Sequence, residues 1–445
     1  MNPSISRQVV YPLQEKLLSR PTFPYLKDLE QSQWYSREDI EALQLNKLHQ
    51  LLSIASQHCP WHAKRIQEAN INPGTCTLEE FRTLPTMNKK DAQMHGSEMV
   101  WKNVPGGLYQ YSTGGSSGQP LIFQFGRMRQ ASDAAGRIRA RRWWGVNVGD
   151  PEVYLWGAPV ELNKTDKIKT IRDRLLNQLV LNAFAMSPEM MGQYLQVIKQ
   201  FKPKCIYGYA SSIALLAAYA QNNKKIDLPD LQVICTTGEP LYPDQRKLIQ
   251  ETFNVPVANE FGSRDIGFTA HETPDQQMLL ISESIILEVL DINGNPVPAG
   301  ETGEAVMTGL CSQAQPFIRY RTGDMITLSD ETDKQGRGLH VIEKIEGRST
   351  DFLVHKNGSI MHALSVIYIL RETEGIEQFK IIQHAVDEFE ILIVPNNRWN
   401  IESKEKITTQ FRARFGQETY INISIIDEIL PEVSGKIRQV VSKIA

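Results

Sequence analysis

Short apolar segments alternate with helix-like segments through the middle of this chain, and this alternation restricts the fold more than any other feature. The strand-like segments are residues 153–156, 205–207 and 231–236, and the helix-like ones are residues 188–200 and 211–220. Elements that alternate in this way build a layered β/α domain with much parallel sheet. Because ligands of such sheets gather where the strands end at their carboxyl side, we expect a ligand site at the loops of this region.

Two loops, residues 207–211 and 236–240, each follow an apolar strand and precede a helix. Trp156 ends an earlier strand. By position, these residues are candidates for a pocket that takes a small aromatic or otherwise compact group. Ordinary sheet packing explains the same residues equally well. The pocket candidates are Trp156, Tyr207, Gly208, Tyr209, Ala210, Thr236 and Thr237.

Residues 111–121 read Tyr-Ser-Thr-Gly-Gly-Ser-Ser-Gly-Gln-Pro-Leu, the densest run of hydroxyls and glycines in the chain. Glycine lets consecutive backbone N–H groups point at one anion, and the hydroxyls add donors, so the run predicts a cradle for a triphosphate. Its composition alone fits a flexible loop equally well. Strand-like flanks, residues 108–111 and 120–125, favour a tight connection. A Walker loop is excluded, because Gly118 is followed by Gln119 and not by a lysine.

The segments on either side of this loop are predicted to be helical. Residues 40–55 repeat apolar side chains at helical spacing, and Pro60 should end that helix because it lacks a backbone N–H. Residues 128–144 form a second predicted helix, rich in arginine. A solvated face with some tryptophan packing is the favoured interpretation of that helix, and docking of a phosphorylated carrier is the alternative. The arginines are Arg129, Arg137, Arg139, Arg141 and Arg142.

From residue 279 onward the β/α alternation gives way to other patterns. Residues 279–344 are predominantly strand-like with Gly and Pro turns, and residues 346–351 form a polar joint. The remainder, about 95 residues, has its own strands and helices, as expected of a small domain. We therefore predict an α/β protein: residues 1–347 form a large domain of layered β/α sheets with a β subdomain, and residues 348–445 form a small, mobile α+β domain.

Composition excludes several classes of protein. A formal net charge of -3 gives no general attraction to nucleic acid or to an anionic membrane. The five cysteines show no metal-binding spacing and fit a reducing cytosol, so we expect a cytoplasmic protein. No apolar run is long enough to predict a membrane anchor or a signal for export. His271 has no cysteine nearby, and we predict no structural zinc.

Four further polar stretches lie at residues 259–265, 319–324, 347–351 and 434–436. Singly they are weak signals, since Asp324 fits a turn and Lys436 fits an exposed tail. In this order, together with the Gly/Ser loop, the set resembles the adenylate-forming superfamily of acyl ligases. The branch it resembles most is that of phenylacetate-coenzyme A ligase and its capsule-biosynthesis relatives. The resemblance covers nearly the whole chain.

The resemblance implies an ATP site. Phe261, where the family usually has tyrosine, would stack on adenine, and Asp324 would accept hydrogen bonds from both ribose hydroxyls. The loop that would hold the β- and γ-phosphates contains Ser112, Thr113, Gly114, Gly115, Ser116, Ser117 and Gly118. Gly238, Glu239 and Pro240 would form the opposite wall of the adenine site, and the remaining nucleotide-binding positions are Asn259, Glu260, Gly262 and Ser263.

The resemblance also implies the catalytic groups. Asp265 stands where the family has a magnesium-binding glutamate, and it keeps a hard carboxylate oxygen. Lys436 matches a mobile lysine that would bridge the α-phosphate and the substrate carboxylate. Arg348 belongs to the joint about which the small domain would rotate. Thr350 and Asp351 stand where many relatives have two consecutive acids, so the residue that acts as the hinge stays open.

The implied reaction joins a small carboxylic acid to ATP, which gives an acyl-adenylate and pyrophosphate, and then transfers the acyl group to the thiol of coenzyme A. An acyl carrier protein, or an amine or hydroxyl in surface-polysaccharide or natural-product synthesis, is the alternative acceptor. A catalytically silent ligand-binding protein is the rival from another class, and the presence of Asp324 and Lys436 disfavours it. The acid is not identified by the sequence. The oligomeric state stays open as well, with a homodimer as one option.

Overall fold

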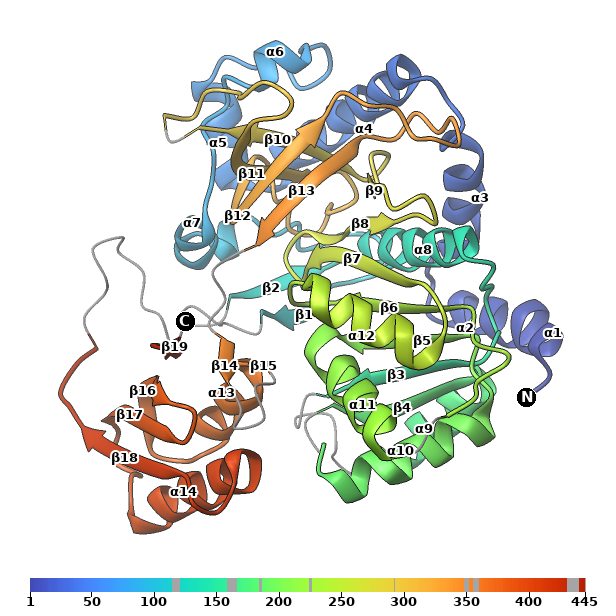
Figure 1. The fold of residues 1–445 in the computed structure, drawn as a ribbon. Helices are drawn as coiled ribbons and strands as arrows, with labels where there is room; N and C mark the ends of the chain where they lie inside the picture. The colour runs from blue at the N-terminus through green and yellow to red at the C-terminus, as the bar shows by residue number, and fades with distance from the viewer. Residues whose placement is uncertain are drawn as a thin grey trace.

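The computed structural model describes residues 1–113, 121–157, 166–183, 186–223, 226–291, 293–347, 352–354, 360–429 and 440–444. Within this part of the chain, an 11-stranded sheet runs through the region before residue 348, and a 4-stranded sheet lies after it (Figure 1). The strand order of the large sheet is β10-β11-β12-β13-β9-β8-β7-β6-β5-β3-β4. This arrangement confirms the predicted α/β fold class.

One half of the large sheet is parallel. Its strands are β3 (Glu152–Trp156), β4 (Gln178–Asn182), β5 (Cys205–Tyr209), β6 (Val233–Thr237) and β7 (Val257–Ser263). The helices between them are α9 (Asp166–Leu175), α10 (Pro188–Phe201), α11 (Ala210–Asn223) and α12 (Pro243–Phe253). All five residues of β5 and of β6 are buried, as expected for parallel strands that are covered on both faces. The alternation predicted from the sequence is confirmed.

The other half of the sheet is antiparallel and begins at β7, which pairs in parallel with β6 and antiparallel with β8. Its strands are β8 (Gly267–Glu272), β9 (Met278–Leu280), β10 (Ile285–Leu290), β11 (Thr302–Gly309), β12 (Tyr320–Ser329) and β13 (Val341–Gly347). The predominantly β character predicted for residues 279–344 is therefore confirmed.

Helices of the first hundred residues cover the antiparallel half: α3 (Thr22–Ser32), α4 (Arg37–His58), α5 (Pro60–Glu68), α6 (Leu78–Phe81), α7 (Lys89–Met94) and η2 (Gly96–Glu98). The segments before them lie nearer the parallel half (Figure 1): α1 (Pro3–Ile5), η1 (Ser6–Val10) and α2 (Tyr11–Leu17). Helix α4 ends at His58, and Pro60 begins the next helix, as its missing N–H predicts. Among the described residues, no helix is both long and apolar enough to cross a bilayer.

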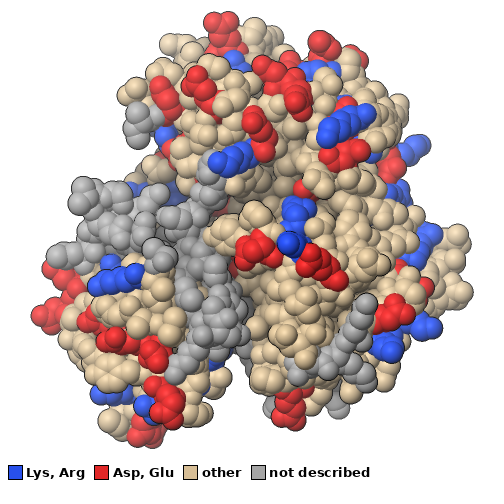
Figure 2. Space-filling model, viewed as in Figure 1, with Lys and Arg blue, Asp and Glu red and all other residues tan. Residues whose placement is uncertain are grey.

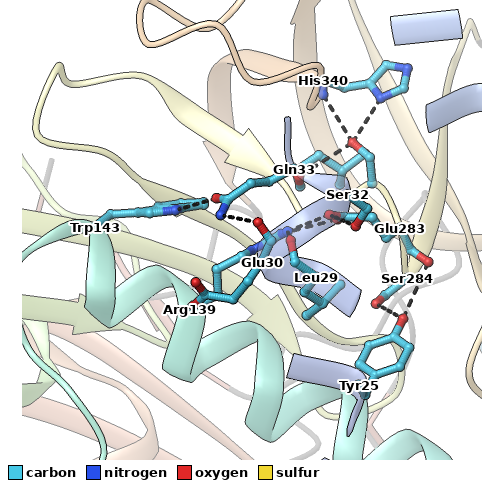
Figure 3. A network of polar contacts seen from close by, with 12 residues as sticks. Tyr25, Leu29, Glu30, Ser32, Gln33, Arg139, Trp143, Glu283, Ser284 and His340 are labelled. Atoms are coloured by element: carbon cyan, nitrogen blue, oxygen red, sulfur yellow. Dashed lines mark hydrogen bonds and ion pairs between the residues drawn. The ribbon is translucent and has the colours of Figure 1, made fainter. Parts of the chain in front are cut away.

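Helix α8 (Arg127–Trp143) is the arginine-rich helix predicted from the sequence, but the predicted solvated face is wrong for three of the five arginines named in the prediction. Arg129, Arg139 and Arg141 are buried. Arg139 pairs with Glu283 and donates to the carbonyl oxygen of Leu29, in a polar network that joins α8 to α3 and to the segment before β10 (Figure 3). Arg129 pairs with Asp133 one turn further along α8, but the partners of Arg139 and Arg141, Glu283 and Glu260, come from distant parts of the chain. The helix sequence alone does not reveal those two partners.

The region after residue 351 has its own sheet, in the order β18-β17-β16-β19 (Figure 1). It also has its own apolar core. Its elements are β14 (Phe352–Val354), β15 (Ile360–His362), α13 (Leu364–Arg371), β16 (Ile376–Ala385), β17 (Glu388–Pro395), α14 (Ile401–Phe415), β18 (Tyr420–Ile425) and β19 (Val440–Ser442). Figure 2 shows acidic and basic side chains interspersed over the face in view, in keeping with the small net charge.

Candidate active site

The hairpin of β1 (Tyr109–Ser112) and β2 (Ile122–Phe125) brackets the predicted phosphate loop. Thr113 and Leu121 close the stem, because the N–H of Thr113 donates to the Leu121 carbonyl and the N–H of Leu121 donates to Thr113 Oγ1, both at 2.9 Å. The strand-like flanks are confirmed. Of the loop itself, only Ser112 and Thr113 are described. Gly114, Gly115, Ser116, Ser117 and Gly118 lie outside the described residues.

The turn between β7 and β8 meets the base of this hairpin. Arg264, in the turn, donates from Nη1 to the carbonyl oxygen of Ser112 at 3.1 Å. An apolar cluster behind the contact contains Phe123 of β2 and Ile266 of the turn, and Phe261 packs against it partly buried. The fold thus brings two motifs that are 152 residues apart in the sequence to one place.

Helix α8 fixes the turn that carries Asp265. Arg129 Nη1 donates to the Asp265 carbonyl at 3.1 Å, and Arg129 Nε donates to Asp133 at 2.9 Å. Asp133 in turn accepts from the N–H of Phe268 at 3.1 Å. Gly267 has φ +114°, and a Cβ there would lie 2.3 Å from Arg129 Nη2, so only glycine fits. The Asp265 residue is buried in this turn.

The carboxyl ends of the parallel strands lie beside the same turn. Gly208 of β5 pairs with Leu155 of β3 and with Thr236 of β6, and Thr236 pairs with Asn259 of β7. The next residue of each strand therefore reaches the same edge of the sheet, where ligands of such folds bind. Gly208 permits the close pairing, since a Cβ there would lie 2.3 Å from the Leu155 carbonyl oxygen.

The predicted pocket residues form an aromatic cluster at this edge. The Trp156 ring stacks on Tyr209 with centroids 4.5 Å apart, and on Tyr207 at 5.8 Å. Trp156 is partly exposed, whereas Tyr207 and Tyr209 are buried. Ala210 and Thr236 have no exposed surface, and Gly208 and Thr237 are buried as well. In this structure, most of the candidates therefore pack within the sheet.

Glu260 takes part in a buried network with α8. Its Oε1 accepts from the Tyr207 hydroxyl at 2.8 Å and from Thr237 Oγ1 at 3.2 Å, and Arg137 Nη2 lies 3.6 Å away. Burial raises the pKa of Glu260, but Arg137 and Arg141 outweigh burial, so that pKa lies below its ordinary value. Its carboxylate faces the arginines of α8.

Sequence reasoning missed the role of Arg137 and Arg141. The signal was available, because Arg129, Asp133, Arg137 and Arg141 recur every four residues and so share one face of the helix. His271 also belongs to this network. Its Nε2 accepts from Arg141 at 2.9 Å while its Nδ1 donates to the Glu272 carbonyl at 2.8 Å, which fixes the neutral tautomer.

The loop after β6 holds Gly238, Glu239 and Pro240. Gly238 has φ +79°, which favours glycine. The carboxylate of Glu239 accepts from the N–H of Ser211 at the start of α11 and so ties this loop to the one after β5. Burial raises the pKa of Glu239 to about 7.

Asp324 lies on an irregular part of β12, where three residues oppose Ala305 alone. Gly323 has φ +77°, and Thr322 Oγ1 both donates to the Ala305 carbonyl and accepts from the N–H of Asp324 at 3.1 Å. The carboxylate of Asp324 is therefore aimed by the backbone of the bulge. Arg348, Thr350, Asp351 and Lys436 lie outside the described residues.

The remaining predicted positions lie along β7. Asn259 donates from its N–H to Glu272 at 2.8 Å, and Ser263 Oγ accepts from the N–H of Ile266 at 3.2 Å. Gly262 opposes the Gly267 carbonyl so closely that a Cβ would lie 2.5 Å from its oxygen. These residues shape the strand and turn that carry Phe261 and Asp265.

Comparison with known proteins agrees with the resemblance drawn from the motifs. Residues 353–443 match the model of the CapK C-terminal domain family. The chain is 23% identical over 413 residues to Protein CapK of Staphylococcus aureus, which covers 91% of this chain and 90% of that protein. It is also 23% identical over 390 residues to the phenylacetate-coenzyme A ligase of Thermus thermophilus, with 80% and 82% covered.

The fold matches that of 2-hydroxyisobutyryl-CoA ligase. The structure of that enzyme with its acyl-adenylate and CoA superposes with a TM-score of 0.61 at 20% identity and covers 91% of this chain and 90% of the other. A second structure of it, in the postadenylation state, gives a TM-score of 0.57 at 20% identity, with 92% and 91% covered. These comparisons confirm the predicted resemblance to adenylate-forming ligases, and they establish the fold.

Proposed function

We propose that this protein, whose fold is that of an adenylate-forming CoA ligase, activates a small carboxylic acid with ATP and passes the acyl group to the thiol of coenzyme A. The observation that carries the proposal is the contact of Arg264 with Ser112. It sets the base of the Gly/Ser loop against the turn that holds Asp265. The similarity to phenylacetate-coenzyme A ligases over most of the chain supports the same reaction class.

ATP would lie along this contact. The loop of residues 112–118 would bind the β- and γ-phosphates through backbone N–H groups and hydroxyls. Phe261 and the loop of Gly238 would enclose the adenine, and Asp324 would bind the ribose. Because the carboxylate of Glu260 is bound to Tyr207 and Thr237, Glu260 would act by holding β7 and would not touch the nucleotide.

The residues present fit a magnesium ion. Asp265 offers a hard oxygen ligand on a turn that two side chains of α8 hold in place. When bound, magnesium would neutralise charge on the phosphates. Arg129 and Asp133 would keep the carboxylate where the phosphates arrive.

Residues 348–445 would form a mobile domain that delivers Lys436 for adenylation. The separate apolar core after residue 351 and the family match over residues 353–443 support this division. A cation between the α-phosphate and the attacking carboxylate offsets the repulsion of two anions. The domain would then withdraw about Arg348, Thr350 or Asp351 to admit the thiol.

Transfer to a carrier protein, or to an amine or hydroxyl, is the alternative second step. The similarity to Protein CapK of Staphylococcus aureus extends over 91% of this chain, more than the 80% for the phenylacetate-coenzyme A ligase, so the acceptor need not be that of the ligase. The adenylation step is common to both versions.

The test is pyrophosphate release across a panel of carboxylic acids, with and without coenzyme A. We expect release with at least one acid and thioester formation when coenzyme A is present. Lys436→Ala should slow adenylation roughly 100- to 1,000-fold, whereas Lys443→Ala, also near the C-terminus and exposed, should not. Pyrophosphate release without thioester formation would indicate that the acceptor is a carrier protein, an amine or a hydroxyl and not coenzyme A. ATP binding without release for any acid would identify a silent binding protein.

A further inference from the structure

The first helical segments of the chain present their apolar face to solvent. Ile5, Val9, Leu13 and Leu17 recur every four residues along α1, η1 and α2, and they are 50%, 55%, 53% and 76% exposed. Single exposed apolar residues are common, but a continuous row of four large ones marks a surface that something else covers.

The opposite face of the same segments is polar and buried. Ser6 and Glu15 are buried, and Arg7 donates to the Val148 carbonyl at 2.8 Å and pairs with Asp150 at 3.0 Å. The Tyr11 hydroxyl accepts from Gln178 of β4 at 2.8 Å. The helices are thus attached to the protein by polar contacts, which is the reverse of the usual amphipathic arrangement.

The π-helical segment η1 keeps the row straight. Residues four apart in an α-helix are displaced about 40° around the axis, so a row of this spacing drifts off one face. A π-helical turn contains more residues and corrects that drift. Its packing is tight, because a Cβ on Gly149 would lie 2.8 Å from the Arg7 nitrogen. The row is therefore a fixed feature of the surface.

The exposed charges of these segments and of the nearby helix α9 are positive. Lys16, next to Leu17 on α2, is exposed, as are Arg172 and Arg174 of α9. Helix α9 packs on β4, and Arg172 lies close enough to Tyr11 to act on it electrostatically. The acids of residues 1–20 and 171–180 are Glu15 and Asp173, both buried against arginines. Two copies of this surface would bring like charges together, whereas an anionic lipid surface complements it.

We propose that the face formed by Ile5, Val9, Leu13 and Leu17 docks on an anionic lipid bilayer and lies in the interface without crossing it. Helices with an apolar row and flanking basic residues bind membranes in this way. Figure 1 shows α1 and α2 on the side of the molecule away from the sheet of β16 to β19, so docking leaves the candidate active site accessible. The overall charge of -3 averages over the whole surface and does not describe this local one.

The test is co-sedimentation of the full chain with vesicles of phosphatidylcholine alone or mixed with phosphatidylglycerol. We expect binding to the mixed vesicles, weaker at high salt, and a loss of about tenfold in partitioning for each of Leu13→Ser and Leu17→Ser. Lys16→Glu with Arg174→Glu should also weaken binding. Ile401→Ser with Ile425→Ser is the matched control, since these residues are 69% and 51% exposed elsewhere.

Three results would overturn the proposal. One is the absence of binding to either kind of vesicle, and another is binding that the leucine variants do not change. The third is a homodimer, measured by light scattering, that the leucine variants dissociate, because the row would then be a contact between copies. All substituted side chains are exposed, so circular dichroism should show unchanged folding.

Discussion

Glu283→Gln should destabilise the large domain far more than the loss of a surface charge. Glu283 and Arg139 have no exposed side-chain surface, and they form a bidentate ion pair between α8 and the segment before β10 (Figure 3). Ser32 donates to Glu283 at 3.0 Å, and Arg139 also donates to the Leu29 carbonyl at 3.0 Å. The substitution keeps the shape of the side chain but leaves the arginine charge buried without a counter-charge.

Removing one partner of a buried pair costs about 3–5 kcal/mol. Glutamine still accepts one hydrogen bond, so we expect the substitution to cost about 3 kcal/mol, the lower end of that range. The double variant Arg139→Met, Glu283→Leu removes both charges. It leaves only the Ser32 hydroxyl and the Leu29 carbonyl without their hydrogen-bond partners, which costs about 1 kcal/mol for each group. It should therefore be more stable than Glu283→Gln alone.

The assay is urea unfolding followed by tryptophan fluorescence, since six of the seven tryptophans precede residue 348 and report on the large domain. Glu304→Gln is the control, because Glu304 pairs with Arg321 where both side chains are partly exposed, and it should cost under about 1 kcal/mol. Equal costs for the two glutamine variants, or a double variant less stable than Glu283→Gln, would refute the reasoning.

Three further predictions concern the candidate site. Burial raises the pKa of Glu239 from 4.5 to about 7, so the folded state binds more protons than the unfolded state and loses stability as pH rises between these values. The Tm of Glu239→Gln should therefore fall less between pH 5.5 and 8 than the Tm of the parent protein. Equal falls would contradict the assignment. Gly208→Ala should separate β3 from β5 and cost more than about 2 kcal/mol in urea unfolding, while Gly74→Ala, whose Cβ would meet nothing closer than 3.8 Å, should cost little. Asp324→Asn should weaken ATP binding in calorimetry about 5- to 150-fold, and an unchanged Kd would leave Asp324 as a residue of the bulge only.

Much of the fold could be predicted because local patterns determine it. The helix expected at residues 188–200 is Pro188–Phe201, and the strand expected at residues 205–207 is Cys205–Tyr209. Both lie in the buried half of the sheet, where apolar runs and turn residues mark the ends of elements. The hairpin around the Gly/Ser loop was predictable for the same reason.

The surroundings of α8 could not be predicted from local patterns. Arg129 and Arg139 are buried because a carbonyl at residue 265 and a carboxylate at residue 283 reach them, and those partners lie more than 130 residues away. A helix with five arginines reads as a solvated surface until its partners are known. The exposed apolar row of residues 5–17 was missed for a different reason. An amphipathic pattern shows that a helix has an apolar face, but it does not show whether that face is buried.

The buried charges of α8 have a physical rationale under the proposed function. A carboxylate that must wait beside incoming phosphates is repelled by them, and a loose turn would move it away until a metal ion arrives. Arg129 and Asp133 bind the backbone of that turn through its carbonyl and N–H groups, so they restrain Asp265 without consuming its side-chain oxygens. Arg137 and Arg141 lie 3.6 and 3.9 Å from the carboxylate of Glu260 and so restrain β7 through that side chain. Apolar packing could not provide such directional restraint, and for this reason polar groups beneath the site are worth their cost of burial.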